Sequence, residues 1–317
     1  MESTTIIICT EKGVLENMSK ILITSIRKFG GVFSNCPIYS FQPRKAQKVS
    51  QQTKRFFEDN QVEFIDLELN KKYAYYPLAN KPMVCAWAEE NLNTEILVFL
   101  DSDVVIFNEP KEFLHIAQNE IRVRPVDLIG AGSNGDCDEN ALYWHSIYRT
   151  LGVTSQNYVN TTVDQKKIFA YWNTGHIVSN KTTEVFSNWK VNFEKVISRN
   201  LAPKNGRFFI EQSTFAATVS AMSVSVKNFA PNYNYPVHLH EENKSKSRIN
   251  DFTSLVSWHY HDLFESTQIP NNIKIFLNSN EKGIWLSSML DEHNLKLPSN
   301  KKKINEFAYK IKNSLTF

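Results

Sequence analysis

The sequence lacks the features that mark several common protein classes. No window approaches the run of about 18 to 20 consecutive apolar residues that a membrane-spanning helix needs. The four cysteines show no CxxC spacing, so we expect free thiols in a reducing compartment. The first residues contain neither the basic segment nor the long apolar run of a signal peptide. These absences predict a cytoplasmic protein with no membrane span.

A strong excess of one charge is also missing. The 36 Lys and Arg residues against 33 Asp and Glu residues give a formal net charge of +3. A nucleic-acid binder that works through bulk charge would be far more basic, so we expect no nucleic-acid partner. The 42% hydrophobic and 22% charged residues are typical of a folded globular chain and exclude a disordered one or a coiled coil.

Strand-sized apolar runs alternate with amphipathic segments along the first two-thirds of the chain. The expected strands cover residues 5–10, 37–41, 62–67, 95–100, 104–107, 127–132, 169–179 and 255–261. The expected helices cover residues 15–28, 44–60 and 82–91. This alternation predicts a single α/β domain with a mostly parallel sheet covered on both faces. In such sheets the ligand crevice lies beyond the carboxyl ends of the strands.

The order of the chain weakens after about residue 243. The basic stretch 244–248 reads as a loop, and the tail from Pro298 reads as a basic, solvated helix. We therefore expect a main domain at residues 1–265 and a partly helical, basic C-terminal extension at residues 266–317.

Two aspartates follow directly on the most apolar predicted strand. Ile96–Leu100 is a run of five apolar residues, and Asp101 and Asp103 come immediately after it. Burying carboxylates there would be costly, unless the strand ends at a crevice in which a divalent cation takes up their charge. Residues two apart face the same side of an extended chain, and hard oxygen ligands suit Mn²⁺ or Mg²⁺. The alternative is an Asp-rich turn whose side chains bond the local backbone.

Four further segments follow in an order typical of one enzyme family. They are NKPMVCAW at 80–87, YWNTGHIV at 171–178, EQS at 211–213 and WHYH at 258–261. With the DxD stretch, they resemble the nucleotide-diphosphosugar transferases of the type A glycosyltransferase fold. The resemblance is strongest to the glycogenin and bacterial galactosyltransferase-like family 8, over roughly residues 4–263.

The resemblance implies a Rossmann-like domain with a mixed, mostly parallel central sheet and a C-terminal helical tail. It also implies a metal-dependent glycosyltransferase that uses Mn²⁺ or Mg²⁺ and a nucleoside-diphosphate sugar, with UDP as the expected nucleotide. The expected reaction retains the anomeric configuration, and the acceptor is a glycan, a lipid or a protein. In such a reaction the enzyme stabilises the negative charge that grows on the leaving diphosphate.

The family's motifs also imply roles for individual residues of this chain. The implied metal ligands are Asp101, Asp103 and His259. The implied donor-binding residues are Thr10, Lys81, Asp101, Ser102, Gly132, Ser133, Thr174, Gly175 and His261. The implied catalytic residues are Asn173, which suits sugar hydroxyls, Glu211, which binds the acceptor or forms an ion pair, and Gln212, which faces the anomeric carbon.

Several of these residues also have a purely structural interpretation. Lys81 and Glu211 suit the first turn of an ordinary helix, and residues 173–175 suit a bulge in an edge strand. Residues 132–133 suit a plain loop. His238 and His240 alternate with metal-like spacing, although a core or surface role is favoured for both.

The segment around the implied metal-binding histidine departs from the family pattern. The family has a Gly followed by a Lys-Pro pair, whereas residues 259–264 read HYHDLF. This leaves open whether His259 or His261 completes the metal site, and what neutralises the leaving phosphate. The family's acidic residue before Gln212 is Asp, and here it is Glu211.

Two other functions compete with sugar transfer. A sugar-phosphate nucleotidyltransferase would need a Gly-rich loop with a basic end after the first strand, whereas residues 9–13 hold one Gly and one Lys. A non-catalytic relative that binds carbohydrate or a partner is the second alternative. The intact pair of Asp101 and Asp103 favours the enzyme over this binding module.

Overall fold

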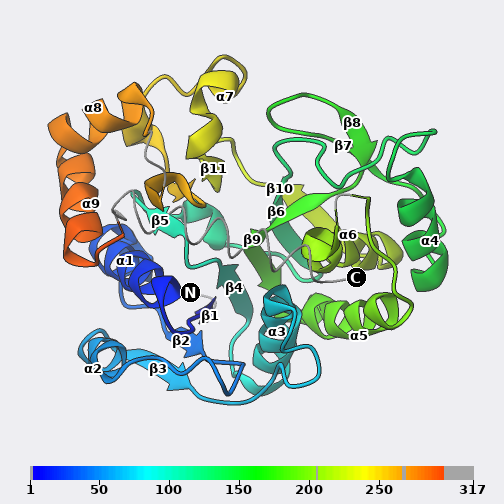
Figure 1. Ribbon diagram of the computed structural model, residues 1–317, viewed down its shortest axis with the longest axis horizontal. Coiled ribbons are helices and arrows are strands. Elements are labelled where there is room, and N and C mark those ends of the chain that lie inside the picture. The colour runs from blue at the N-terminus through cyan, green and yellow to red at the C-terminus, as the bar shows by residue number, and fades with distance from the viewer. Residues whose placement is uncertain (1–2, 205, 266–268, 296–317) are drawn as a thin grey trace.

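A seven-stranded sheet forms the centre of the protein in a computed structural model that describes residues 3–204, 206–265 and 269–295 (Figure 1). Its strand order is β10-β6-β9-β4-β1-β2-β3. The strands are β1 (Thr4–Cys9), β2 (Ile38–Phe41), β3 (Val62–Ile65), β4 (Ile96–Leu100), β6 (Glu120–Pro125), β9 (Trp172–Asn180) and β10 (Ser225–Asn228). All neighbours pair in parallel except β9, which runs antiparallel to both β4 and β6. The mixed, mostly parallel sheet predicted from the sequence is confirmed.

Helices cover both faces of this sheet because successive strand residues point to opposite sides. Ile6 and Ile8 of β1 pack in one core with α1 (Val14–Phe29) and α2 (Gln51–Asp59). Ile7 packs in a second core on the other face. The helices of that second face are α3 (Asn80–Asn91), α4 (Ala141–Leu151), α5 (Val185–Ser198) and α6 (Ile210–Ala221). The buried apolar run of β4 separates the two cores.

A smaller sheet lies beside the carboxyl end of the large one. Its order is β11-β12-β5, with β5 (Val104–Ile106) antiparallel to β12 (Ser257–His259) and β11 (Tyr235–Pro236) parallel to β12. Trp258 of β12 is fully buried in a third core with α8 (Asn271–Ser279) and α9 (Glu281–Glu292). A short helix, α7 (His240–Ser247), and a two-stranded ribbon of β7 (Tyr158–Asn160) and β8 (Lys167–Phe169) complete the arrangement.

Three predicted elements differ in the structure. The helix expected over 44–60 begins only at Gln51, because Ser50 caps it and the Arg44 side chain pairs with the buried Glu11. The strand expected over 127–132 is wrong, since this segment is irregular and Gly130 has a φ of +47°. The strand that lies next to β9 in this part of the sheet is β6. The loop expected over 244–248 is wrong as well, because residues up to Ser247 belong to α7.

Other expectations are confirmed or lie outside the described residues. The strand expected over 169–179 divides into β8 and β9, and the one over 255–261 shortens to β12. The four cysteines are free thiols. In the part of the chain that the structure describes, no helix is both long and apolar enough to cross a membrane. The helix predicted from Pro298 onward lies outside the described residues.

Candidate active site

The strand order brings the DxD and the 171–178 segment to one edge of the sheet. Leu100, the last residue of β4, pairs with His176 of β9, and the Asp101 amide donates to the Gly175 carbonyl oxygen at 2.8 Å. Because β9 runs antiparallel, its beginning rather than its end lies at the carboxyl edge of β4. The aspartates themselves occupy a turn closed by a 3.2 Å hydrogen bond from the Val104 amide to the Asp101 carbonyl oxygen.

Asp103 lies among two histidines of the neighbouring β12 segment. His259 pairs with Val104 across the small sheet, and the Tyr260 amide donates to the Asp103 carbonyl oxygen at 3.1 Å. His259 Nε2 lies 3.3 Å from Asp103 Oδ1, and His261 Nδ1 lies 3.7 Å from Asp103 Oδ2. The two imidazole rings stack with centroids 3.8 Å apart. One ligand atom of each of these three residues lies within 4.8 Å of the others, which suits a single metal ion.

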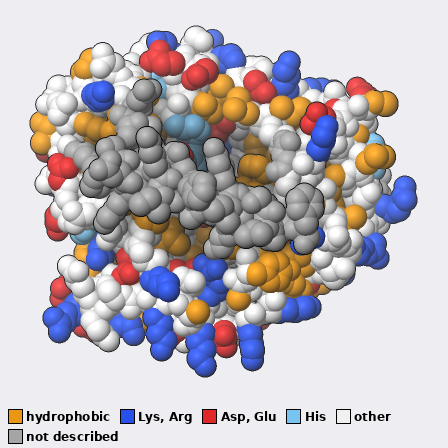
Figure 2. Space-filling view, viewed as in Figure 1, with side chains coloured by type: hydrophobic (Ala, Val, Ile, Leu, Met, Phe, Trp, Pro, Cys, Tyr) orange, Lys and Arg blue, Asp and Glu red, His pale blue; other side chains and the backbone are white. Residues whose placement is uncertain are grey.

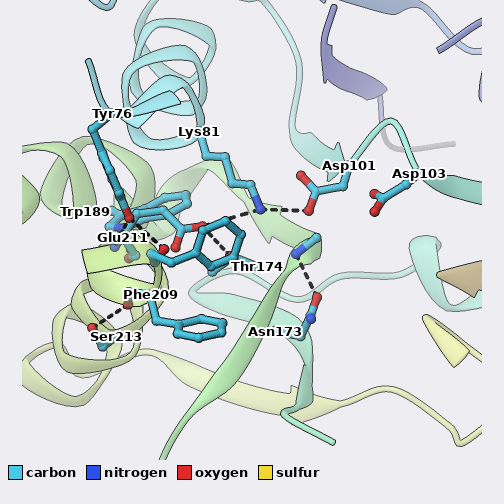
Figure 3. Close-up of polar contacts among 12 residues, drawn as sticks. Tyr76, Lys81, Asp101, Asp103, Asn173, Thr174, Trp189, Phe209, Glu211 and Ser213 are labelled. Carbon is cyan, nitrogen blue, oxygen red and sulfur yellow. Dashed lines mark hydrogen bonds and ion pairs between the residues drawn. The ribbon is translucent and has the colours of Figure 1, made fainter. Parts of the chain in front are cut away.

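Asp101 faces a different partner, although it is only two residues away. Lys81, in the first turn of α3, donates to Asp101 Oδ2 at 2.7 Å and lies 3.4 Å from Glu211 Oε1 (Figure 3). The Thr174 hydroxyl donates to the same Glu211 oxygen at 2.8 Å. Asp101, Lys81, Glu211 and Thr174, which come from four separate predicted segments, therefore form one connected chain of polar contacts.

The charges in this crevice shift the pKa values of their neighbours. Burial lowers the pKa of Lys81, but the carboxylates of Asp101 and Glu211 outweigh burial and hold this pKa above its ordinary value. Burial raises the pKa values of Asp101 and Glu211, and Lys81 opposes both shifts. Lys81 is therefore a fixed positive charge between the partly exposed Asp101 and the buried Glu211.

The pKa values of Asp103, His259 and His261 do not all shift in the same direction. The pKa of Asp103 lies below its ordinary value because His259 outweighs the effect of burial. Burial would lower the pKa of His259, but the Asp103 carboxylate reverses this and raises it. Burial and the charge of His259 lower the pKa of His261 to about 2. His261 is thus a neutral imidazole with a lone pair to offer.

Gly175 permits the close approach of these groups. A Cβ atom at this position would lie 2.6 Å from His259 Cε1, 2.7 Å from Asp101 Oδ2 and 3.0 Å from Asn173 Oδ1. Real Cβ contacts essentially never fall below 3.0 Å. The bare backbone therefore lets the side chains of three predicted site residues converge on one point of β9.

Asn173 is held in a defined orientation at the beginning of β9. Its Oδ1 atom accepts from the Gly175 amide at 2.8 Å and from Asn234 Nδ2 at 3.0 Å. Gln212, next to Glu211 in α6, is half-buried. The Gln212 side chain interacts with the Tyr171 hydroxyl, so of the three predicted catalytic residues only Glu211 contacts Lys81 directly.

Thr10 and the remaining predicted donor-binding residues make mostly internal contacts. The Thr10 hydroxyl donates to Ser19 Oγ at 2.7 Å and accepts from Ser40 Oγ at 2.8 Å, and it is fully buried. The Ser133 hydroxyl donates to Asp138 Oδ2 at 2.9 Å in the loop that also contains Gly132. Ser102 is buried in the turn between the aspartates.

Several supporting residues escaped the sequence reasoning. The Tyr76 hydroxyl donates to the Phe208 carbonyl oxygen at 2.9 Å and accepts from the Glu211 amide at 3.3 Å. The Trp189 indole donates to the Glu211 carbonyl oxygen at 2.9 Å. These contacts fix the start of α6, and no local pattern around Tyr76 or Trp189 indicates them. His238 lies edge-on to His261 with ring centroids 4.6 Å apart, whereas His240 pairs with the Tyr235 hydroxyl.

A mixed sheet with two aspartates beyond a central strand, faced by a histidine segment, is the arrangement of a type A glycosyltransferase fold. The chain belongs to the Rhodobacterales glycosyltransferase domain family, which it matches over residues 6–223. It therefore contains a glycosyltransferase domain. No curated protein sequence matches it significantly.

Two solved structures of one glycosyltransferase share this fold at low sequence identity. The glycosyltransferase GlyE of Streptococcus pneumoniae TIGR4 aligns with a TM-score of 0.53 and 10% identity, over 94% of this chain and 66% of that one. Its apo form aligns with a TM-score of 0.52 and 11% identity, over 98% and 64% of the two chains. Mouse xyloside xylosyltransferase 1 aligns with a TM-score of 0.48 and 9% identity, over 82% and 98%. This chain thus spans slightly less than two thirds of GlyE.

Proposed function

We propose that the protein is a metal-dependent glycosyltransferase that transfers a sugar from a UDP-sugar to a glycan, lipid or protein acceptor with retention of configuration. We further propose that it is related to the glycogenin and galactosyltransferase-like family 8. The observation that carries this proposal is the convergence of Asp103, His259, Lys81 and Glu211 on the carboxyl edge of the sheet. In α/β sheets this edge is where ligands bind.

The residues beside Asp103 fit a divalent cation. Asp103, His259 and His261 offer a carboxylate and two imidazoles within 4.8 Å, and Asp101 lies beside them in the same crevice. In the bound state the metal, Mn²⁺ or Mg²⁺, would supply Lewis-acid stabilisation of the leaving diphosphate. Asp103 and His259 are the proposed core ligands, with Asp101 as a further ligand when the donor is present.

Lys81 is the proposed cation for the leaving phosphate. The chain has no Lys-Pro pair after His261, so the positive charge must come from another segment. Lys81 Nζ already lies 2.7 Å from Asp101 Oδ2, next to the proposed metal ligands. We propose that its ammonium turns toward a donor phosphate when the nucleotide enters, and that Glu211 keeps it charged.

We propose that the donor sugar lies against the beginning of β9. Asn173 and Thr174 offer an amide and a hydroxyl to sugar hydroxyl groups, and Gly175 allows the backbone to approach closely. Gln212 faces the anomeric carbon, and Glu211 orients Thr174 and the acceptor. Ser102, Gly132, Ser133 and His261 complete the donor pocket.

The nucleotide base is proposed to lie near the end of β1. Thr10 stands at this end, but its hydroxyl is engaged with Ser19 and Ser40. We propose that Thr10 orders the strand end around the base through these bonds. We also propose a cytoplasmic location, because all four thiols are free, and a nucleotide-sugar-binding domain at residues 1–265 with an extension at residues 266–317.

Calorimetric titration of UDP, with Mn²⁺ and with EDTA, tests the proposal. We expect UDP to bind the wild-type protein only with the metal, and Asp103→Asn to lose that binding. Asp262→Asn is the matched control, because Asp262 is an exposed carboxylate next to His261. If UDP binds only with the metal but is released from none of the UDP-sugars, the result would favour a non-catalytic protein that binds carbohydrate or a partner. Absence of metal-dependent UDP binding would refute the proposal.

A further inference from the structure

We propose that the metal is held by Asp103 and two imidazoles, from His259 and His261, before the nucleotide arrives and without Asp101. This ligand set would select nitrogen-preferring ions such as Co²⁺, Ni²⁺ or Zn²⁺, and Mn²⁺ among the harder ions, over Mg²⁺. The inference rests on the proposed function and deepens it by naming the resting ligands and the metal class.

The first argument is based on the distances between the ligand atoms of Asp103, His259 and His261. Two ligand atoms bound to one ion at about 2.1 Å lie about 3.0 to 3.5 Å apart in octahedral or tetrahedral arrangements. His259 Nε2 and Asp103 Oδ1 are 3.3 Å apart, and His261 Nδ1 and Asp103 Oδ2 are 3.7 Å apart. These two contacts reach different oxygens of Asp103, and one ligand atom of each of the three residues lies within 4.8 Å of the others, so the side chains must move closer to share one ion.

The backbone of His261 carries the second step. Its φ is +49°, in the left-handed region that residues with a side chain adopt rarely. Such conformations persist where the surrounding structure demands them and gather at functional sites. Here the conformation accompanies a ring that stacks on His259 and presents Nδ1 to Asp103.

The partner of Asp101 carries the third step. Asp101 Oδ2 accepts from Lys81 at 2.7 Å, so its carboxylate is already neutralised without a metal. Lys81 in turn is shared with Glu211 at 3.4 Å. The first aspartate of the DxD therefore belongs to a lysine-centred ion pair in the resting protein, and the second belongs to the histidines.

The donor types decide the metal class. Two imidazoles and one carboxylate favour the later first-row divalent ions, whose affinities for nitrogen ligands exceed those of Mg²⁺. Mg²⁺ prefers oxygen ligands and retains much of its water. The His261 side chain remains 37% exposed, so an ion can reach it from solvent. Figure 2 shows some histidine side chains on this face of the molecule.

Metal binding without nucleotide tests the inference. The full-length protein is titrated with Co²⁺ and with Mg²⁺ by calorimetry, and the visible absorption of Co²⁺ reports its ligands. We expect Co²⁺ to bind at least tenfold more tightly than Mg²⁺, and His261→Gln to weaken Co²⁺ at least tenfold and change its absorption. Asp101→Asn should change Co²⁺ affinity less than threefold. His238→Gln, the matched control, removes the imidazole that packs edge-on against His261 and should leave Co²⁺ binding unchanged.

Three results would overturn the inference. They are equal affinities of the wild-type protein for Co²⁺ and Mg²⁺, an unchanged Co²⁺ spectrum in His261→Gln, or a loss in His238→Gln as large as in His261→Gln. The comparison of Co²⁺ with Mg²⁺ needs no variant, so it stands even if His261→Gln fails to fold. Because these metal titrations contain no UDP, their failure would not decide whether the protein releases UDP in a metal-dependent way. A separate assay measures that release. Conversely, Co²⁺ binding as described without UDP binding would refute only the proposed function.

Discussion

Replacing Gly175 with alanine should disable the site without unfolding the protein. The added Cβ would lie 2.6 Å from His259 Cε1, so the two atoms must separate by about 0.8 Å to reach the ordinary contact of 3.4 Å. Overpacking of this size costs about 1 to 3 kcal/mol in the free energy of unfolding. A misplacement approaching 1 Å in a reacting site lowers the rate by about 10²-fold. We therefore expect Gly175→Ala to reduce metal-dependent UDP release about 100-fold.

Gly152→Ala is the matched control for the loss of stability. Gly152 ends α4 with a φ of +72°, and a Cβ there would meet nothing within 4 Å. Alanine at this position is strained in its backbone and should cost about 1 kcal/mol without touching the site. Denaturant unfolding and UDP release are measured for both variants. Activity in Gly175→Ala within threefold of wild type, or an equal loss in both variants, would refute the reasoning.

Three further substitutions separate stability from chemistry. Glu16→Gln should lower the free energy of unfolding by about 1 to 2 kcal/mol at pH 7, because the Glu16 carboxylate accepts from the backbone amides of Gly13 and Ser50. Hydrogen bonds from the Ser50 and Thr53 hydroxyls, together with those from the two amides, outweigh burial and hold the pKa of Glu16 below its ordinary value. The stabilisation by Glu16 is therefore present above the unfolded pKa and is lost as the pH falls through the folded pKa. The stabilities of the two proteins, measured by urea unfolding at pH 7 and pH 3, should converge at the acid end. Lys81→Met should reduce UDP release about 10² to 10³-fold and cost about 3 kcal/mol, since it removes the cation between Asp101 and the buried Glu211. Wild-type kinetics of this variant would contradict the role of Lys81. Leu286→Ala in α9 should cost about 2 to 5 kcal/mol in a single unfolding transition, whereas a separate early transition would show that the C-terminal helices unfold independently.

The acidic half of the site could be predicted from the sequence for a local reason. A fully apolar run followed at once by Asp101 and Asp103 has few structural solutions other than a central strand that ends at a crevice. The spacing of His259 and His261 would place both imidazoles on one side of an extended strand. The structure corrects the extended geometry of both patterns: Asp101 and Asp103 lie in a turn and face different partners, and His261 lies beyond the end of β12 with a φ of +49°.

The contacts that join distant segments could not be predicted in this way. The Lys81 ion pair with Asp101 and Glu211 depends on how α3 and α6 approach the sheet edge. Asn234, which orients Asn173, has no local signal at all. Only the long-range packing of the helices and loops decides these partners.

Misleading hydropathy explains the error at residues 127–132. That segment is apolar enough for a strand, whereas β6 contains Arg122 and Arg124 and looks too polar. Arg124 is nevertheless buried, because its guanidinium donates to the carbonyl oxygens of Pro231 and Tyr233. A buried arginine satisfied by distant carbonyl groups cannot be recognised from hydropathy.

Release of UDP from a panel of UDP-sugars, with Mn²⁺ or with EDTA, tests most directly whether the Asp103 cluster drives sugar transfer. The wild-type protein and Asp262→Asn should release UDP from at least one donor only with the metal. Asp103→Asn should release it at least 100-fold more slowly. Equal release in EDTA, or unchanged release by Asp103→Asn, would contradict the account.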